Sequence, residues 1–137
     1  MKKYELTEEV NKQGLHRIRA LRDIQIYGVK KGDLGGFVER ENNLSQEGDC
    51  WIADNATVKD FAGVCDDALV MGYATVMDNA TVRGYAIVMN FARVCDTALV
   101  MGFARVMGNA IVSGYAIVRG YASVNVNAEI GKNAIIG

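Results

Sequence analysis

His16 is the only histidine of the chain, and histidine is the most frequent general acid or base near neutral pH. The candidate thiol nucleophiles are Cys50, Cys65 and Cys95. One histidine cannot supply the three imidazole ligands of a histidine-only zinc site. Three widely spaced cysteines also argue against a disulfide framework. We therefore expect no catalytic site, no metal and no bound cofactor, and we interpret the cysteines as small hydrophobic residues.

The charges of the chain nearly cancel, with 15 basic and 16 acidic residues and a net charge of −1. Arg83 and Arg119 occupy equivalent places in the repeat described below, but Met101 lies between them, so no basic stripe forms. Gly, Asp or Asn interrupts the apolar residues every few positions, so no membrane span is expected. We expect neither a nucleic acid nor a membrane as a partner.

The N-terminal sequence MKKYELTEEV has two lysines but no apolar stretch after them. This pattern is not that of a secretory signal peptide. Together with the unpaired cysteines, it predicts a cytoplasmic protein of a reducing compartment.

Most of the chain is a six-residue repeat, and this repeat must position the residues of any binding surface. From Ala56 to Ala134, fourteen alanines follow one another at intervals of six residues. A Val or Ile stands two residues after each alanine, and Gly, Asp or Asn stands two residues later again. Only Val126 and Lys132 depart from this last column.

The repeat predicts short strands separated by corners. Residues two apart in a strand point to the same side, so Ala and Val face inward together. Gly, Asp and Asn tolerate positive φ and let the chain turn after each strand. Three such units close a three-sided prism of eighteen residues per coil, with about 4.8 Å between coils. Residues 50–137 then form a solenoid of about five coils.

The segments EIGKNAIIG (129–137) and MGNAIV (107–112) resemble the hexapeptide repeat of left-handed parallel β-helix proteins. The resemblance covers about two thirds of the chain and implies a left-handed coil, a sense that periodicity does not reveal. Residues 1–49 lack the repeat and read as two or three short strands with tight turns. A solenoid end needs a cover, so we expect an all-β protein with a small β-rich N-terminal cap at 1–49 and a β-helix at 50–137.

The outward columns of the prism contain the candidate interface. Every eighteenth residue lies on the same face or edge, and one face becomes apolar toward the C-terminus through Leu99, Ile117 and Ile135. An exposed apolar row typically marks an interface. A second candidate is an edge of flexible side chains, which suit partner contacts: Met71, Met89 and Met107. Along another edge, Tyr85, Phe103 and Tyr121 are placed to pack on one another.

These columns favour self-association as a dimer or a trimer. The last coil adds to this expectation, because nothing in the printed sequence covers its strand edges after Gly137. Either the apolar row or this end of the solenoid can contact a second copy. Lateral and end-to-end assembly therefore both stay open.

Our leading hypothesis is a non-enzymatic scaffold that binds another protein. The stretch GDLGGFVERENNLSQEGDCWI (32–52) resembles the leader of uncharacterised phage and bacterial hexapeptide-repeat proteins that carry a provisional transferase label. This resemblance implies a phage or prophage accessory protein, for example an inhibitor of a host defence enzyme. The first alternative is an acyltransferase that uses acyl-CoA between subunits, with His16 as its base. The second is a structural or filament component.

Overall fold

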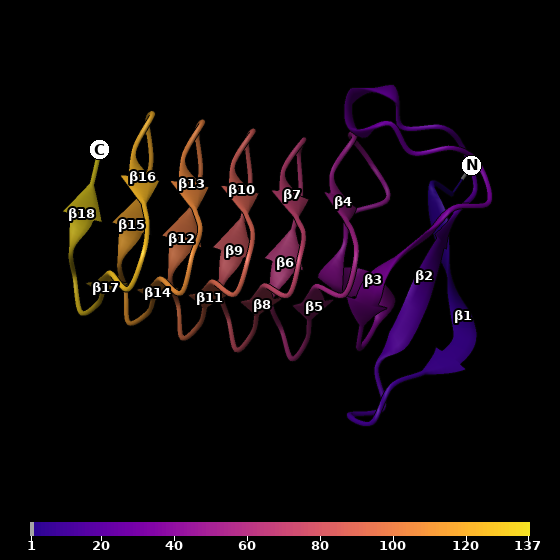
Figure 1. Cartoon of the computed structure of the whole chain (residues 1–137), viewed down its shortest axis with the longest axis horizontal. Helices are drawn as coiled ribbons and strands as arrows, with labels where there is room; N and C mark the ends of the chain where they lie inside the picture. The colour runs from indigo at the N-terminus through magenta and orange to yellow at the C-terminus, as the bar shows by residue number, and fades with distance from the viewer. Residues whose placement is uncertain (1) are drawn as a thin grey trace.

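The structure, a computed structural model, describes residues 2–137 as a coil of short strands with a small sheet at its N-terminal end (Figure 1). The N-terminal part holds two short 3-10 helices, η1 (Gln25–Tyr27) and η2 (Glu41–Asn43). Its strands are β1 (Tyr4–Val10), β2 (His16–Ala20) and β3 (Leu34–Val38). Fifteen two-residue strands follow: β4 (Trp51–Ile52), β5 (Thr57–Val58), β6 (Gly63–Val64), β7 (Leu69–Val70), β8 (Thr75–Val76), β9 (Thr81–Val82), β10 (Ile87–Val88), β11 (Arg93–Val94), β12 (Leu99–Val100), β13 (Arg105–Val106), β14 (Ile111–Val112), β15 (Ile117–Val118), β16 (Ser123–Val124), β17 (Glu129–Ile130) and β18 (Ile135–Ile136).

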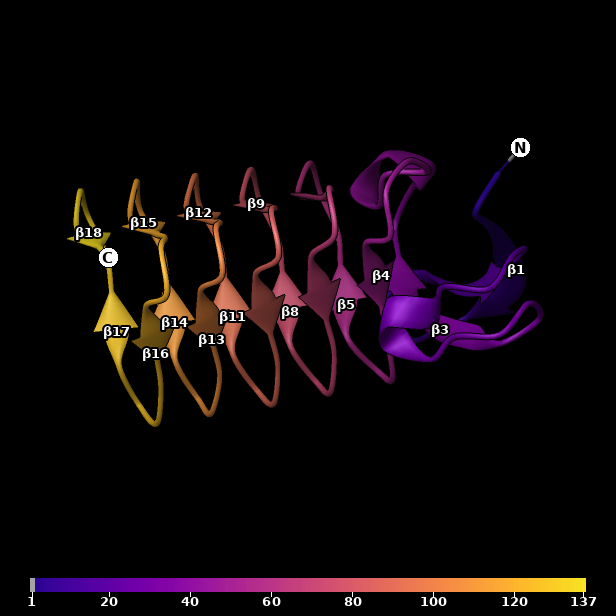
Figure 2. The same cartoon turned by 90° about the horizontal axis from the view of Figure 1, so that it is seen from above.

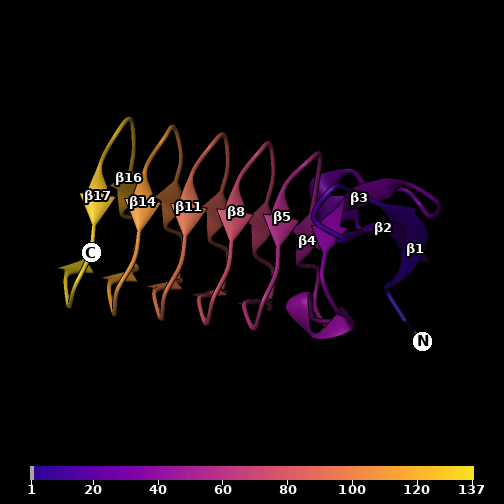
Figure 3. The ribbon, with the colours of Figure 1, turned by 90° about the horizontal axis from the view of Figure 1, so that it is seen from below.

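The short strands form three parallel sheets, one on each side of a prism (Figures 2 and 3). Face 1 has the order β1-β2-β3-β5-β8-β11-β14-β17, face 2 the order β6-β9-β12-β15-β18, and face 3 the order β4-β7-β10-β13-β16. Neighbouring strands are in register at a separation of eighteen residues, as in the pair Leu99–Ile117. The all-β, three-sided parallel β-helix predicted from the repeat is therefore confirmed. Its left-handed sense stays a prediction from the resemblance.

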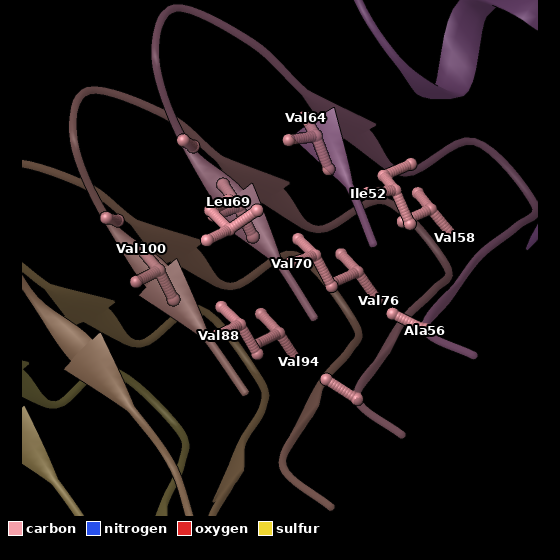
Figure 4. Packing of buried hydrophobic residues seen from close by; sticks show 14 of the residues in the cluster. Ile52, Ala56, Val58, Val64, Leu69, Val70, Val76, Val88, Val94 and Val100 are labelled. Atoms are coloured by element: carbon pink, nitrogen blue, oxygen red, sulfur yellow. The ribbon is translucent and has the colours of Figure 1, made fainter. Parts of the chain in front are cut away.

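The inward Ala and Val columns form the core. Val88, Val94 and Val100 are fully buried, as are the alanines that precede them, and Figure 4 shows valines of successive coils in the interior. Only the Ala and the Val or Ile of each six-residue repeat point inward, so the core is narrow and admits little change in side-chain volume. The backbone of each coil is bonded to the next, for example from Leu99 N to Ala116 O at 2.9 Å.

The corners have the backbone conformation that the Gly, Asp and Asn column predicts. Asp78 and Asp96 have φ values of 58° and 55°. Each aspartate also accepts a hydrogen bond from the next coil: Asp78 Oδ2 from Asp96 N at 3.0 Å, and Asp96 Oδ2 from Gly114 N at 2.8 Å. Val126 and Lys132 adopt the same positive φ, at 58° and 54°, so these two departures from the column do not interrupt the coil.

The first coil begins inside the segment that the sequence assigns to the cap. Val38 of β3 pairs in parallel with Val58, and Leu44 forms a parallel bridge with Val64. With β4, these residues make an additional turn, and the solenoid has about six turns. The six-residue repeat does not reveal this turn, because Leu44 and Ile52 are eight residues apart rather than six.

The β1-β2-β3 meander is continuous with face 1, so cap and solenoid share one sheet. Gly35 and Gly36 permit the close approach of β3 to the first coil. A Cβ on Gly35 would lie 2.5 Å from the carbonyl oxygen of Ile52, and a Cβ on Gly36 would collide with the carbonyl oxygen of Ala56. Any larger residue at these two positions would push the meander away from the coils.

Buried polar side chains of the N-terminal segment pair with the backbone of the first coils. Asn43 Nδ2 donates to Ala62 O at 2.8 Å, and Lys3 Nζ donates to Cys50 O at 2.7 Å and to Gly48 O at 3.2 Å. Burial lowers the pKa of the Lys3 ammonium, although the nearby Cys50 partly opposes this shift. These contacts satisfy carbonyl groups that would otherwise be unpaired at the end of the solenoid.

Candidate functional site

The register aligns the predicted apolar row on face 2. Leu99 pairs with Ile117, and Ile117 pairs with Ile135, so the three side chains follow one another at successive coils. Leu99 and Ile117 are half-buried and Ile135 is exposed. Thr81 continues the column toward the cap. The apolar row is thus a narrow strip on the C-terminal half of one face.

The predicted methionine column lies on a different edge of the prism. Met71, Met89 and Met107 directly follow the strands β7, β10 and β13 of face 3. All three are half-buried, and Met71 packs against the core. The six predicted interface residues therefore form two separate patches, one on face 2 and one at the edge that follows the strands of face 3.

The third column forms a ladder of stacked aromatic rings, as the sequence predicts. The ring centroids of Tyr85 and Phe103 are 5.2 Å apart, and those of Phe103 and Tyr121 are 5.1 Å apart. The interplanar angles are 3° and 7°. The rings are nevertheless exposed, with 47 % of Tyr85, 50 % of Phe103 and 83 % of Tyr121 accessible. Stacking fixes their positions without removing them from the surface.

This aromatic ladder is one wall of a groove along face 3 with a volume of about 480 Å³. The floor comes from the outward residues of β10, β13 and β16, which are Ile87, Arg105 and Ser123. Ile26 and Tyr27 of η1 line the end nearest the cap. We call this hollow the face 3 groove. Its lining comes from the solenoid and from the cap together.

The six-residue repeat predicts the aromatic column but does not reveal the groove. The position of η1 beside face 3 depends on contacts between residues far apart in the sequence, and the six-residue repeat does not predict such contacts. One signal was available in the sequence: Leu69 is an apolar residue at an outward position of face 3, and in the structure it is buried. An apolar residue at the cap end of that column required a cover, and η1 of the cap lies at this end of the groove.

Tyr27 attaches η1 to the solenoid. Its hydroxyl donates a hydrogen bond to the backbone carbonyl of Asp67, which belongs to the same column as the aromatic ladder. Burial, together with the Asp67 carboxylate, raises the pKa of Tyr27 to about 12. The phenol is therefore neutral and able to donate at any physiological pH, and the cap end of the groove is held in place.

One positive charge lines the groove. Arg105 is the one charged residue among those that line it, and within residues 2–137 it forms no ion pair. The neighbouring polar groups are hydroxyls, on Tyr85, Tyr121 and Ser123. No carboxylate is among the residues that line the groove, so an anion bound beside Arg105 would meet hydrogen-bond donors there.

Two smaller hollows lie next to the cap. One, of about 470 Å³, is lined by η2 and the following loop together with Gly63, Cys65 and Thr81 of the first coils. Glu41 and Glu47 make it acidic. The other, of about 460 Å³, lies between the β1-β2 turn and the Lys59–Asp60 corner. Neither contains an aromatic residue.

His16 lies in the cap on β2, where the sequence places it. Its Nδ1 is 2.9 Å from the carbonyl oxygen of Thr7, so in the neutral ring Nδ1 carries the proton and Nε2 is the acceptor. The residue pairs with Val38 across β2 and β3. It lines none of the three hollows.

One trio of side chains has the spacing of metal ligands: the ligand atoms of Asp78, Cys95 and Asp96 all lie within 4.8 Å of one another. Both aspartates already accept a backbone hydrogen bond at the corner. Burial and the two carboxylates raise the pKa of Cys95, which keeps its thiol protonated. Because the thiolate is the metal-binding form, this trio is better explained as a part of the corner structure.

The free thiols occupy unrelated places. Cys50 is buried in the first coil with its sulfur 3.2 Å from Lys3 Nζ, and burial raises its pKa. Cys65 and Cys95 are half-buried at two different edges of the prism. The interpretation of all three as small hydrophobic residues agrees with these positions.

Comparison with known proteins gives no family assignment: no protein-family model matches the chain, and no curated protein is significantly similar to it. Among residues 2–137 there is also no helix with the length and hydrophobicity to cross a bilayer. Function must therefore be argued from the surface described above.

Proposed function

We propose that this protein is a rigid scaffold that binds another protein through the face 3 groove. The observation that carries the proposal is the exposed aromatic ladder beside that groove. Tyrosine and arginine are enriched among the residues that dominate binding energy at protein interfaces. They contribute large contact areas, and tyrosine loses little conformational entropy on binding because it has only two side-chain torsions.

The rigidity of the wall supports the same proposal. Tyr85 N donates to Gly102 O, and Phe103 N donates to Gly120 O, both at 2.8 Å. Tyr85 and Phe103 are thus each fixed by a backbone hydrogen bond to the next coil and by ring stacking, and Tyr121 is stacked on Phe103. A surface that is already ordered avoids much of the entropic cost that partners incur on binding.

A capture experiment tests this function. The tagged full-length chain is incubated with bacterial lysate, because the N-terminal leader resembles phage and bacterial proteins, and bound proteins are quantified by mass spectrometry. A double variant, Tyr85→Ser with Phe103→Ser, removes two rings of the ladder. Tyr115→Ser is the matched control, because Tyr115 is a 68 % exposed aromatic residue of the same repeat position on another edge.

We expect a partner that the wild type and Tyr115→Ser recover equally and that the double variant recovers at least about tenfold less, the effect of losing central aromatic anchors. Circular dichroism establishes that all three chains are folded. Equal recovery by the double variant, or no partner for any chain, would refute the proposal.

We also propose that the protein self-associates through the apolar row on face 2. Contiguous apolar surface is uncommon on monomers unless it serves an interface. The row Leu99–Ile117–Ile135 lies on a different face from the groove, so self-association leaves the groove accessible to a second protein. The mass of the protein in solution tests this part of the proposal.

A further inference from the structure

The two ends of the face 3 groove differ in chemistry. The end next to the cap is apolar, with Ile87 as its floor and Ile26 of η1 above it. One coil further from the cap, the floor residue is Arg105, and one more coil further it is Ser123. A ligand that fits along this groove needs an apolar group at the cap end and a hydrogen-bond acceptor, preferably anionic, at the other.

We propose that the groove binds an extended segment of a partner protein in which an apolar side chain and an acidic side chain are separated by one residue. This inference rests on the proposed function and names the chemistry of the partner. In an extended chain, residues two apart point to the same side and are about 7 Å apart. Ile87 and Arg105 are one coil apart, about 4.8 Å, and the long arginine side chain spans the remainder.

Charge complementarity is the reason for the acidic residue. The Arg105 guanidinium has no ion-pair partner within the described residues, and no carboxylate lines the groove. A carboxylate can accept two parallel hydrogen bonds from one guanidinium. The hydroxyls of Tyr121 and Ser123 provide further donors at the same end.

The single positive charge of the groove favours a peptide segment over a polyanion. One guanidinium matches one carboxylate, whereas a nucleic acid strand carries a phosphate at every nucleotide and needs several cations in a row. The remainder of the lining is aromatic and aliphatic. Tyr121 is largely exposed at the end of the groove away from the cap, which leaves room for a bound segment above it.

The experiment selects ligands from a phage-displayed library of random peptides about twelve residues long, with the full-length protein as bait. Binding of the best synthetic peptide is then measured by fluorescence anisotropy. The variants are Arg105→Glu and, as matched control, Arg93→Glu. Arg93 is also an exposed, outward arginine in the first position of a two-residue strand, but it lies on face 1.

We expect the wild type to enrich peptides with an apolar residue and an Asp or Glu two positions apart. Arg105→Glu should weaken binding of the selected peptide by at least about tenfold, because an attractive charge pair becomes a repulsive one, and Arg93→Glu should not. A peptide in which the acid is replaced by Lys should bind Arg105→Glu better than the wild type. This exchange of charge identifies the contact as direct.

Peptides that need Phe103 but show no acidic preference, or that bind Arg105→Glu unchanged, would overturn the inference while the proposed function stands. The inference is also overturned if a single-stranded oligonucleotide of random sequence binds in an Arg105-dependent way and no peptide does. If the lysate capture gives no groove-dependent partner, the proposed function itself fails. The two experiments therefore distinguish the two failures.

Discussion

At the scale of single residues, the corners decide how much backbone strain the solenoid contains. Most corners use Gly, Asp or Asn, which adopt positive φ readily. Val126 is a β-branched residue at φ 58°, the most unfavourable type at such a position. Its side chain is also exposed, so it contributes little packing energy to the core. The strain at Val126 is therefore not offset by packing.

Val126→Asn should raise the free energy of unfolding by about 1 kcal/mol, since the left-handed conformation costs roughly 1–2 kcal/mol for a residue with a branched Cβ. The control is Val126→Thr, which keeps the branched shape and should leave stability unchanged. Urea unfolding measures both, and amide exchange at Asn109, whose N–H is bonded to Val126 O, reports on the last coils directly. Equal stability of the Asn variant and the wild type would contradict the prediction.

At the scale of the elements, the contact between η1 and the solenoid shapes the groove. Tyr27 makes this contact by donating its phenolic hydrogen to the carbonyl of Asp67. Burial, assisted by the Asp67 carboxylate, raises the pKa of Tyr27 to about 12, above the ordinary value of 10.0. A phenol whose pKa is raised in the folded state stabilises that state below the unfolded pKa. The stabilisation disappears as the pH rises through the folded pKa.

Tyr27→Phe should lower the free energy of unfolding by about 1 kcal/mol at pH 8, the usual contribution of one hydrogen bond. This difference from the wild type should shrink between pH 10 and pH 12, where the phenol is ionised in the unfolded chain but still protonated in the native one. Urea unfolding of both chains at several pH values gives the comparison, because their other titrating groups are the same. A difference that stays constant up to pH 12 would exclude the hydroxyl as the attachment of η1.

At the scale of the whole molecule, the prism places the two proposed interfaces on different faces. The apolar row lies on face 2 and the groove on face 3. Face 1 is extended by the cap meander and carries outward residues of mixed character, among them Thr75, Arg93 and Glu129. Self-association and partner binding can therefore be separated by single substitutions on different faces.

Ile117→Arg should convert the proposed oligomer into a monomer, because it places a charge at the centre of the apolar row. Ile111→Arg is the matched control, since Ile111 is an equally half-buried outward isoleucine on face 1. Sedimentation velocity measures the mass of each chain. We expect a dimer or a trimer for the wild type and the control, and a monomer for Ile117→Arg. A wild type that sediments as a monomer would refute self-association through face 2.

The aromatic ladder shows how far a periodic sequence can predict a site. The interval of eighteen residues was enough to place Tyr85, Phe103 and Tyr121 in one column and to predict their stacking, because each coil repeats the geometry of the last. The same interval aligned Leu99 with Ile117.

The sequence by itself determined which residues point inward, where the chain turns and which side chains share a column. Each of these follows from local preferences repeated every six residues: strand alternation, positive φ at the corners and a core too narrow for anything larger than Val or Ile. Tertiary structure alone decided that β3 and Leu44 belong to the first coil and that Tyr27 lies at the end of the face 3 groove. These features depend on contacts between residues far apart in an aperiodic segment, which no local pattern encodes.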